Sequence, residues 1–180
     1  MVLWFQRLSN PECSIDHVRP ATFPIFMRDN DRTRAARLLT RIAKRALLKL
    51  PRDRHGRPIP GNATIEFSLL PHREMERLQR AYLPRRLARG RQNAHHFPNV
   101  LSFPTPKGFP HPPRIRPLLG EVYVNERVVR DEGVPRAAYF LIHGILHCAG
   151  YRHVRNRDML QMERIEKRLM RHLFPPQRSR

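Results

Sequence analysis

The sequence predicts an α+β fold in which a small mixed sheet of about four strands packs against helices. Short segments with strand character alternate with longer segments whose apolar residues recur at helical spacing. The 180 residues are 40% hydrophobic, which is enough for the core of one domain, and they contain no internal repeat. We therefore expect residues 1–180 to form a single domain.

The first quarter of the chain predicts one strand and one helix. Residues 1–8 are mostly apolar and predict a first strand. Asp31 is a suitable N-cap for a helix that runs to about Leu50. The apolar stripe expected on this helix consists of Leu38, Leu39, Ile42, Ala43, Ala46 and Leu47.

The middle of the chain predicts the rest of the sheet. After a turn-rich connector over residues 51–62, residues 63–70 predict a strand and residues 71–82 a helix. Residues 100–103 and 120–125 predict two further strands. Between them, residues 104–117 contain six prolines and are expected to form an extended loop.

The most informative segment is the apolar one that follows. Residues 137–142 are free of helix breakers and predict a buried helix that continues through His143 and His147. Positions i and i+4 lie on one face of a helix, so the two imidazoles can point to one spot. Gly150 is expected to end the helix, because glycine adopts the left-handed conformation without steric penalty. The chain can then reverse and return His153 to the same place.

These three histidines predict a metal site. Three protein ligands leave a fourth position for water or substrate, which is typical of catalytic zinc sites. The alternative is a set of core histidines bonded to backbone carbonyls. The spacing equals that of the metzincin proteases, which carry a glutamate as general base directly after the first histidine. Here that position is Gly144, so the sequence disfavours proteolysis.

The end of the chain predicts one more amphipathic helix, over residues 158–173. Its expected core side consists of Met159, Met162, Ile165, Leu169 and Leu173. The two cysteines, Cys13 and Cys148, provide no disulfide framework, which favours a reducing compartment. Cys148 is expected to pack in the buried helix, with a role as fourth metal ligand as the alternative.

Three blocks between residues 65 and 173 resemble the YbeY family of metal-dependent endoribonucleases, in the family's order. The family motif His-Gly-x-Leu-His-x-x-Gly-Tyr-Asp-His is matched by residues 143–153, with Arg152 in place of the aspartate. Residues 99–104, Asn-Val-Leu-Ser-Phe-Pro, resemble a second block, and residues 120–124, Gly-Glu-Val-Tyr-Val, a third. The resemblance implies a zincin-like domain with one Zn²⁺ per chain.

The resemblance also implies a function. It suggests a zinc-dependent endoribonuclease that cleaves single-stranded RNA in 3′-end maturation of small-subunit ribosomal RNA and in ribosome assembly. The implied partners are ribosomal RNA and the small ribosomal subunit or its assembly factors. The alternative is a non-catalytic RNA-binding assembly factor that keeps its zinc. The sequence identifies no strong general base near the ligands.

One departure from the family concerns a catalytic position. The family has an arginine directly after the tyrosine that ends the helix preceding the Val-Leu-Ser-Phe-Pro strand, and here that position is Leu83. Arg85 and Arg86 follow and are the candidate catalytic arginines, which would stabilise charge that develops in the transition state. They begin a basic insertion over residues 84–97, which also contains His95 and His96 as alternative metal ligands.

Charge favours a nucleic-acid partner independently of the resemblance. The chain has 35 Lys+Arg against 15 Asp+Glu, a formal net charge of +20. Such an excess repels itself unless a polyanion neutralises it, and arginine suits phosphate and bases. The residues expected to contact RNA are Arg85, Arg86, Arg89, Arg91 and Arg152. An acidic membrane surface is the alternative, but no basic helix carries the exposed apolar face that it needs.

The sequence also bears on location. No run of 18 apolar residues is present, so no membrane span is expected. Residues 1–8 are too short for a secretion signal, and acidic residues follow them. We expect a cytoplasmic protein, with an organellar matrix as the alternative. The oligomeric state is not predicted.

Overall fold

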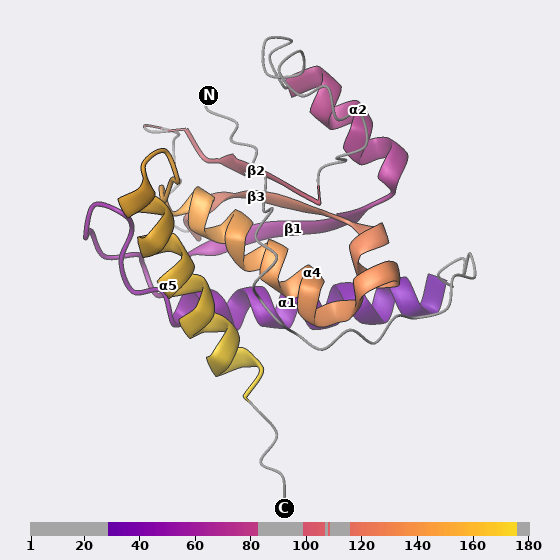
Figure 1. The fold of residues 1–180 in the computed structure, drawn as a ribbon, viewed down its shortest axis with the longest axis horizontal. Helices are drawn as coiled ribbons and strands as arrows, with labels where there is room; N and C mark the ends of the chain where they lie inside the picture. Colours follow the sequence, from indigo (N-terminus) through magenta and orange to yellow (C-terminus); the bar gives the residue numbers. More distant parts are fainter. Residues whose placement is uncertain (1–28, 83–98, 107, 109–115, 176–180) are drawn as a thin grey trace, which may run out of the picture.

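A computed structural model describes residues 29–82, 99–106, 108 and 116–175. In this part of the chain, helices and strands alternate as expected for an α+β protein (Figure 1). The elements are α1 (Asp29–Leu48), β1 (Thr64–Leu70), α2 (His72–Tyr82), β2 (Val100–Pro104), β3 (Leu118–Asn125), α4 (Glu126–Cys148) and α5 (Asn156–Leu173). The predicted fold class is confirmed.

The described strands form a mixed sheet in the order β1-β3-β2. The central strand β3 is parallel to β1 and antiparallel to β2, and Val122 is paired with Phe67 on one side and Ser102 on the other. The three internal strands are therefore those that the sequence predicts. The predicted first strand, residues 1–8, lies outside the described residues.

Helices α4 and α1 lie side by side on the sheet, and α5 packs against both of them (Figure 1). Helix α4 contacts β2 and β3, whereas α1 contacts β1. Alternate residues of a strand point to opposite faces. Val122 and Val124 are fully buried in the core, and the intervening Tyr123 ring meets Phe103 edge to face at 5.7 Å. The site-bearing helix is thus held by the sheet below it and by two helices beside it.

Helix α1 differs from the prediction in two details. It begins at Asp29, so Asp31 lies in the first turn instead of at the N-cap. There its carboxylate still interacts favourably with the helix dipole. Leu39 is fully buried, but Leu38 is 36% exposed, because one residue along a helix turns the side chain by about 100°. The predicted apolar stripe was therefore too wide.

Helix α4 contains a kink that the sequence analysis did not predict. Gly133 has φ 84° and ψ 174°, which breaks the helical path. The preceding turns are capped by Asn125, whose side chain accepts a hydrogen bond from the Arg127 N–H at 3.0 Å. Pro135 follows the kink, where the N–H that it lacks would be unpaired in any case. The predicted buried helix over residues 137–142 is confirmed, because all but the partly buried Tyr139 are buried.

Helix α5 has a different buried face from the predicted one. Met162 and Leu169 are buried as predicted, whereas Met159 is 44% exposed, so its assignment to the core was wrong. Glu166 is only 4% exposed. The buried face thus includes a carboxylate in place of one methionine. None of the helices in the described ranges combines the length and hydropathy needed to cross a membrane.

Candidate metal centre

Three histidine side chains converge at the C-terminal end of α4. His143 and His147 lie one turn apart on the helix, and His153 comes from the loop that follows. The His143 and His147 Nε2 atoms are 3.0 Å apart, and the His147 and His153 Nε2 atoms are 3.1 Å apart. All three residues are buried, and each offers one ligand atom to a common point. The predicted grouping is confirmed.

The loop reverses through a hydrogen-bonded helix end. Gly150 has φ 85° and donates its N–H to the His147 carbonyl at 3.0 Å. The Tyr151 N–H reaches back to the Leu146 carbonyl at 2.9 Å. These two bonds form a Schellman motif, which uses glycine for its left-handed residue. The motif turns the chain sharply enough to return His153 to the last turn of α4.

Hydrogen bonds to the remote ring nitrogens determine which atoms face the common point. His147 Nδ1 lies 2.9 Å from the Tyr151 carbonyl oxygen, which can only accept, so Nδ1 carries the proton. His143 Nδ1 lies 2.7 Å from Glu166 Oε1 and donates to that carboxylate. In the neutral rings, both Nε2 atoms therefore present lone pairs to each other. Such lone pairs repel unless a cation or a proton lies between them.

The spacing also fits a zinc ion. Zinc–nitrogen bonds of about 2.0–2.1 Å at tetrahedral angles place two ligand nitrogens roughly 3.3 Å apart. The two separations of 3.0 and 3.1 Å are close to this value, and all three ligand atoms lie within 4.8 Å of one another. Burial lowers the pKa of His147 to about 3, with smaller contributions from the neighbouring His143 and His153. Burial and His143 also lower the pKa of His153. Both rings are thus held in the neutral form that binds metals.

Glu166 is a candidate functional residue that the sequence analysis missed. Its second carboxylate oxygen accepts a hydrogen bond from the Tyr139 hydroxyl at 3.2 Å. Burial and Glu166 raise the pKa of Tyr139, so its hydroxyl remains a donor. A carboxylate that holds the Nδ1 proton of a ligand fixes the ring and increases its basicity. The sequence does contain one indication of this role, which is the position of Glu166. It lies four residues after Met162 and three before Leu169, and therefore on the apolar side of the helix.

Gly144 lies where α4 packs tightly against the sheet. A Cβ atom at this position would lie 2.6 Å from Val122 Cγ1 and 3.2 Å from Val100 Cγ2. The face of α4 that carries Gly144, directly after the first histidine of the cluster, therefore packs closely against β2 and β3. A glutamate here would overlap the Val122 side chain unless that side chain moved, so the packing disfavours a metzincin-type base.

Cys148 packs against β3, as predicted. Its sulfur lies 3.8 Å from the Glu121 carbonyl oxygen and close below Gly120. Burial raises the pKa of its thiol to about 12. Within the described residues, the cluster able to hold a metal consists of the three histidines without Cys148.

The predicted RNA-contacting arginines are placed only in part. Arg152 is half-buried beside the ligands, and its positive charge contributes to the lowered pKa of His147. Arg85, Arg86, Arg89 and Arg91 lie outside the described residues, as do Leu83, His95 and His96. Their roles stay predictions.

The fold and the site together define an α+β domain with a cluster of three histidines, able to hold a metal ion, on a buried helix and the loop that follows it. A family model described as endoribonuclease YbeY matches residues 55–174, and the chain belongs to this family. The endoribonuclease YbeY of Chromohalobacter salexigens is 42% identical over 83 residues, which cover 41% of this chain and 51% of the relative. The chain thus spans about half the length of this curated relative.

Proposed function

We propose that this protein is a zinc-dependent endoribonuclease that cleaves single-stranded RNA. The observation that carries the proposal is the convergence of three Nε2 atoms beside a glycine that leaves no room for a peptidase base. The match to a family described as endoribonucleases supports RNA as substrate. The net charge of +20 supports a polyanionic substrate independently.

Each part of the site has a proposed task. His143, His147 and His153 would hold the ion, and Glu166 would keep His143 oriented. Bound zinc supplies a Lewis acid that polarises a phosphoryl oxygen or lowers the pKa of a water. Arg152 adds positive charge at the rim, where a phosphate arrives. We further propose Arg85 and Arg86 as donors to the charge that develops in the transition state.

The proposed biological role follows the family resemblance. It is 3′-end maturation of small-subunit ribosomal RNA and ribosome assembly, with ribosomal RNA and the small subunit or its assembly factors as partners. We propose a cytoplasmic location, with an organellar matrix as the alternative, and one domain for the whole chain.

An RNA cleavage assay with and without chelator tests the activity. We expect the zinc-loaded protein to cut single-stranded RNA, the chelated protein to be inactive, and readded zinc to restore cleavage. Denatured casein should stay intact, because Gly144 stands where peptidases carry their base. Chelator-sensitive casein cleavage that is lost in His143→Ala would instead identify a peptidase.

A second candidate function is a zinc-containing RNA-binding assembly factor without turnover. Leu83, at the position of the family's arginine, is the observation that favours it. This candidate predicts zinc binding and RNA binding by a protein that leaves RNA intact. The same assay, combined with metal analysis, separates the two candidates.

A further inference from the structure

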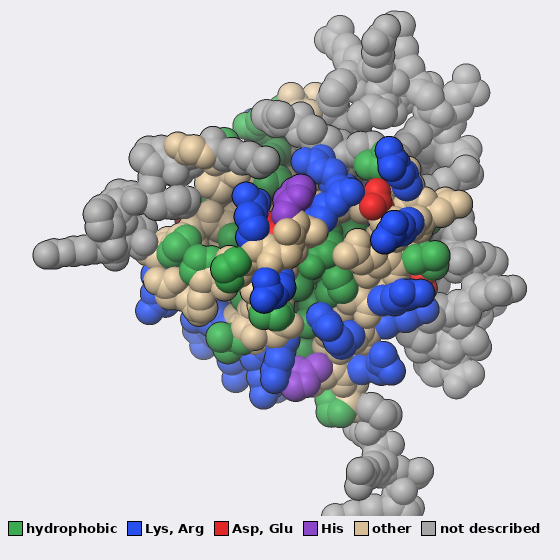
Figure 2. All heavy atoms as spheres, turned by 90° about the vertical axis from the view of Figure 1, so that its left-hand side faces the viewer, with side chains coloured by type: hydrophobic (Ala, Val, Ile, Leu, Met, Phe, Trp, Pro, Cys, Tyr) green, Lys and Arg blue, Asp and Glu red, His purple; other side chains and the backbone are tan. Residues whose placement is uncertain are grey.

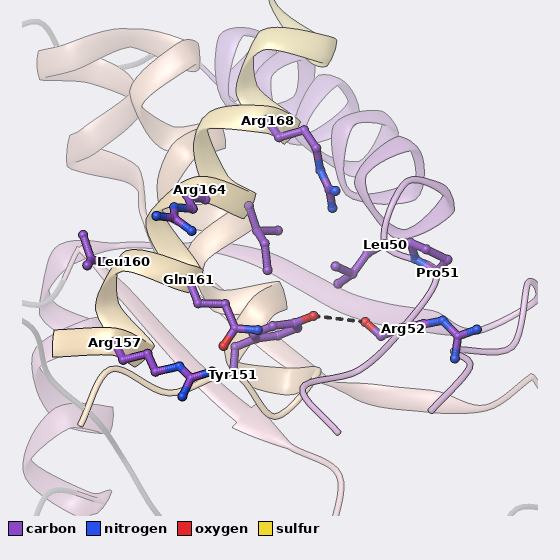
Figure 3. A pocket seen from close by; sticks show the side chains of 10 residues that line it. Leu50, Pro51, Arg52, Tyr151, Arg157, Leu160, Gln161, Arg164 and Arg168 are labelled. Carbon is purple, nitrogen blue, oxygen red and sulfur yellow. Dashed lines mark hydrogen bonds between the residues drawn. The ribbon is translucent and has the colours of Figure 1, made fainter. Parts of the chain in front are cut away.

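A groove lies between α5 and the segment that follows α1, on the outer side of the metal loop (Figure 3). It has a volume of about 730 Å³. Its lining combines apolar side chains with arginines: Leu50, Pro51, Arg52, Tyr151, Arg157, Leu160, Gln161, Arg164, Ile165 and Arg168. The proposed metal chemistry uses none of these side chains.

The positive charge of the groove comes mainly from one face of α5. Arg157, Arg164 and Arg168 occupy positions i, i+7 and i+11, and therefore project from the same side of the helix. At 1.5 Å per residue they extend over roughly 16 Å. The backbone of Arg52 forms part of the opposite wall, whereas its guanidinium points away from the groove and donates to the Gly56 carbonyl (Figure 3).

These α5 guanidinium groups are available for a ligand. All three are exposed, and within the described part of the chain none of them makes a hydrogen bond or an ion pair. The acidic neighbours on α5 are engaged elsewhere: Asp158 pairs with Arg54, and Glu163 pairs with Lys167. On this side of the molecule lysine and arginine side chains outnumber acidic ones (Figure 2). An anion is therefore the ligand that the surface favours.

The apolar floor of the groove indicates which kind of anion would bind there. Leu160 is 53% exposed and Ile165 is only partly buried, so apolar surface lies between the arginines, whereas Leu50 is buried and supports the floor from below. A single-stranded nucleic acid matches both features, since its phosphates can pair with guanidinium groups while its unpaired bases cover apolar and planar surfaces. The bases of a duplex are sealed inside it and cannot do so. A carboxylate-rich peptide would satisfy the arginines but would leave this floor uncovered.

The groove and the metal centre share one residue. The Tyr151 ring lines the groove, and its hydroxyl donates to the Arg52 carbonyl at 3.3 Å (Figure 3). The Tyr151 carbonyl accepts from His147 Nδ1, and ligand His153 lies two residues further along. A strand held in the groove therefore lies against the loop that carries the third ligand.

We propose that this groove is a second RNA-binding site, which holds a single-stranded segment next to the one at the metal centre. The choice of RNA over other single-stranded polyanions rests on the proposed function. The arginines bind phosphates, and the apolar floor receives bases. The groove contributes affinity and placement of the substrate but no chemistry.

Binding of a fluorescein-labelled twelve-nucleotide 2′-O-methyl oligouridylate, chosen because it resists cleavage, to the zinc-loaded full chain tests this site. The test variant carries Arg157→Gln, Arg164→Gln and Arg168→Gln. We expect its Kd to rise on the order of 10-fold, and its salt slope to fall by about 2, since each lost single-strand phosphate contact removes about 0.7. A gel confirms that the RNA is intact in each sample.

Helix α1 provides a matched control. Arg34, Arg41 and Arg45 have the same i, i+7, i+11 spacing, are exposed, and do not line the groove. Their triple glutamine variant removes the same charge and should change the Kd less than 3-fold. Equal losses for the two triple variants would mean that only net charge matters, and would overturn the proposal. An unchanged Kd in the α5 variant would overturn it too.

Two further readouts separate the possible failures. If poly-glutamate displaces the RNA as well as unlabelled oligouridylate of equal charge does, the groove recognises acidic protein segments and the proposal is wrong. Zinc content and thermal midpoint should match those of the unmodified protein, which excludes misfolding. Because binding is measured without cleavage, an inactive protein that still binds RNA through the groove would contradict the proposed function alone.

Discussion

Glu166 Oε1 on α5 accepts a hydrogen bond from His143 Nδ1 on α4 at 2.7 Å, and both residues are buried. This contact joins the last helix of the fold to the first ligand of the site. It means that α5 acts on the metal centre without supplying a ligand.

Replacing Glu166 by glutamine should weaken zinc binding by about 10- to 100-fold. Glutamine keeps the shape and can still accept from His143 Nδ1, but it removes the negative charge that makes the ring a stronger ligand. Competition with a zinc-binding dye measures the effect. Glu163→Gln is the matched control, because Glu163 is exposed and pairs with Lys167 at the surface. Equal zinc affinities in the two variants would rule out the role assigned to Glu166.

His147→Ala should remove most of the zinc, which we expect at about one equivalent per chain in the unmodified protein. His147 is the central member of the cluster, with an Nε2 atom about 3 Å from each of the other two. Elemental analysis of the purified variant measures the loss. Retention of a full equivalent would show that the histidines are not the ligands.

Gly144→Ala should destabilise the protein, although alanine normally favours a helix over glycine. The new methyl group would lie 2.6 Å from Val122 Cγ1, and overpacking of this kind costs about 1–3 kcal/mol. A fall of roughly 2–10 °C in Tm is expected for a chain of this size. Gly61→Ala, where the added carbon meets no atom within 4 Å, should leave Tm almost unchanged. A Tm for Gly144→Ala at or above that of the control would contradict the close packing.

Arg85→Ala with Arg86→Ala should slow RNA cleavage by about 10-fold or more at saturating RNA, the scale expected for a lost transition-state donor. Zinc content should not change, because neither residue is a ligand. If the two arginines only hold phosphates, RNA binding weakens, the salt slope falls by roughly 1–2, and the saturated rate stays normal. The saturated rate therefore decides between the two roles.

The sequence predicted the parts of the fold and site that depend on local pattern. The internal strands, the buried helix and its end at Gly150 follow from apolar runs and glycine chemistry, and the three histidines follow from spacing. Glu166 could not be found in the same way, because its partner lies 23 residues away and only the packing of α5 on α4 brings them together. The same packing decides that Met159 is exposed while a carboxylate is buried. Gly133 was missed because a single glycine does not by itself indicate a kink.

The contact between Gly144 and Val122 also has an evolutionary consequence. A single codon change from glycine to glutamate would place a carboxylate directly after the first histidine of such a motif. In this protein such a change would first require smaller residues on β2 and β3, and those residues also hold the helix in place. The packing of the sheet thus sets a steric barrier to a carboxylate at position 144.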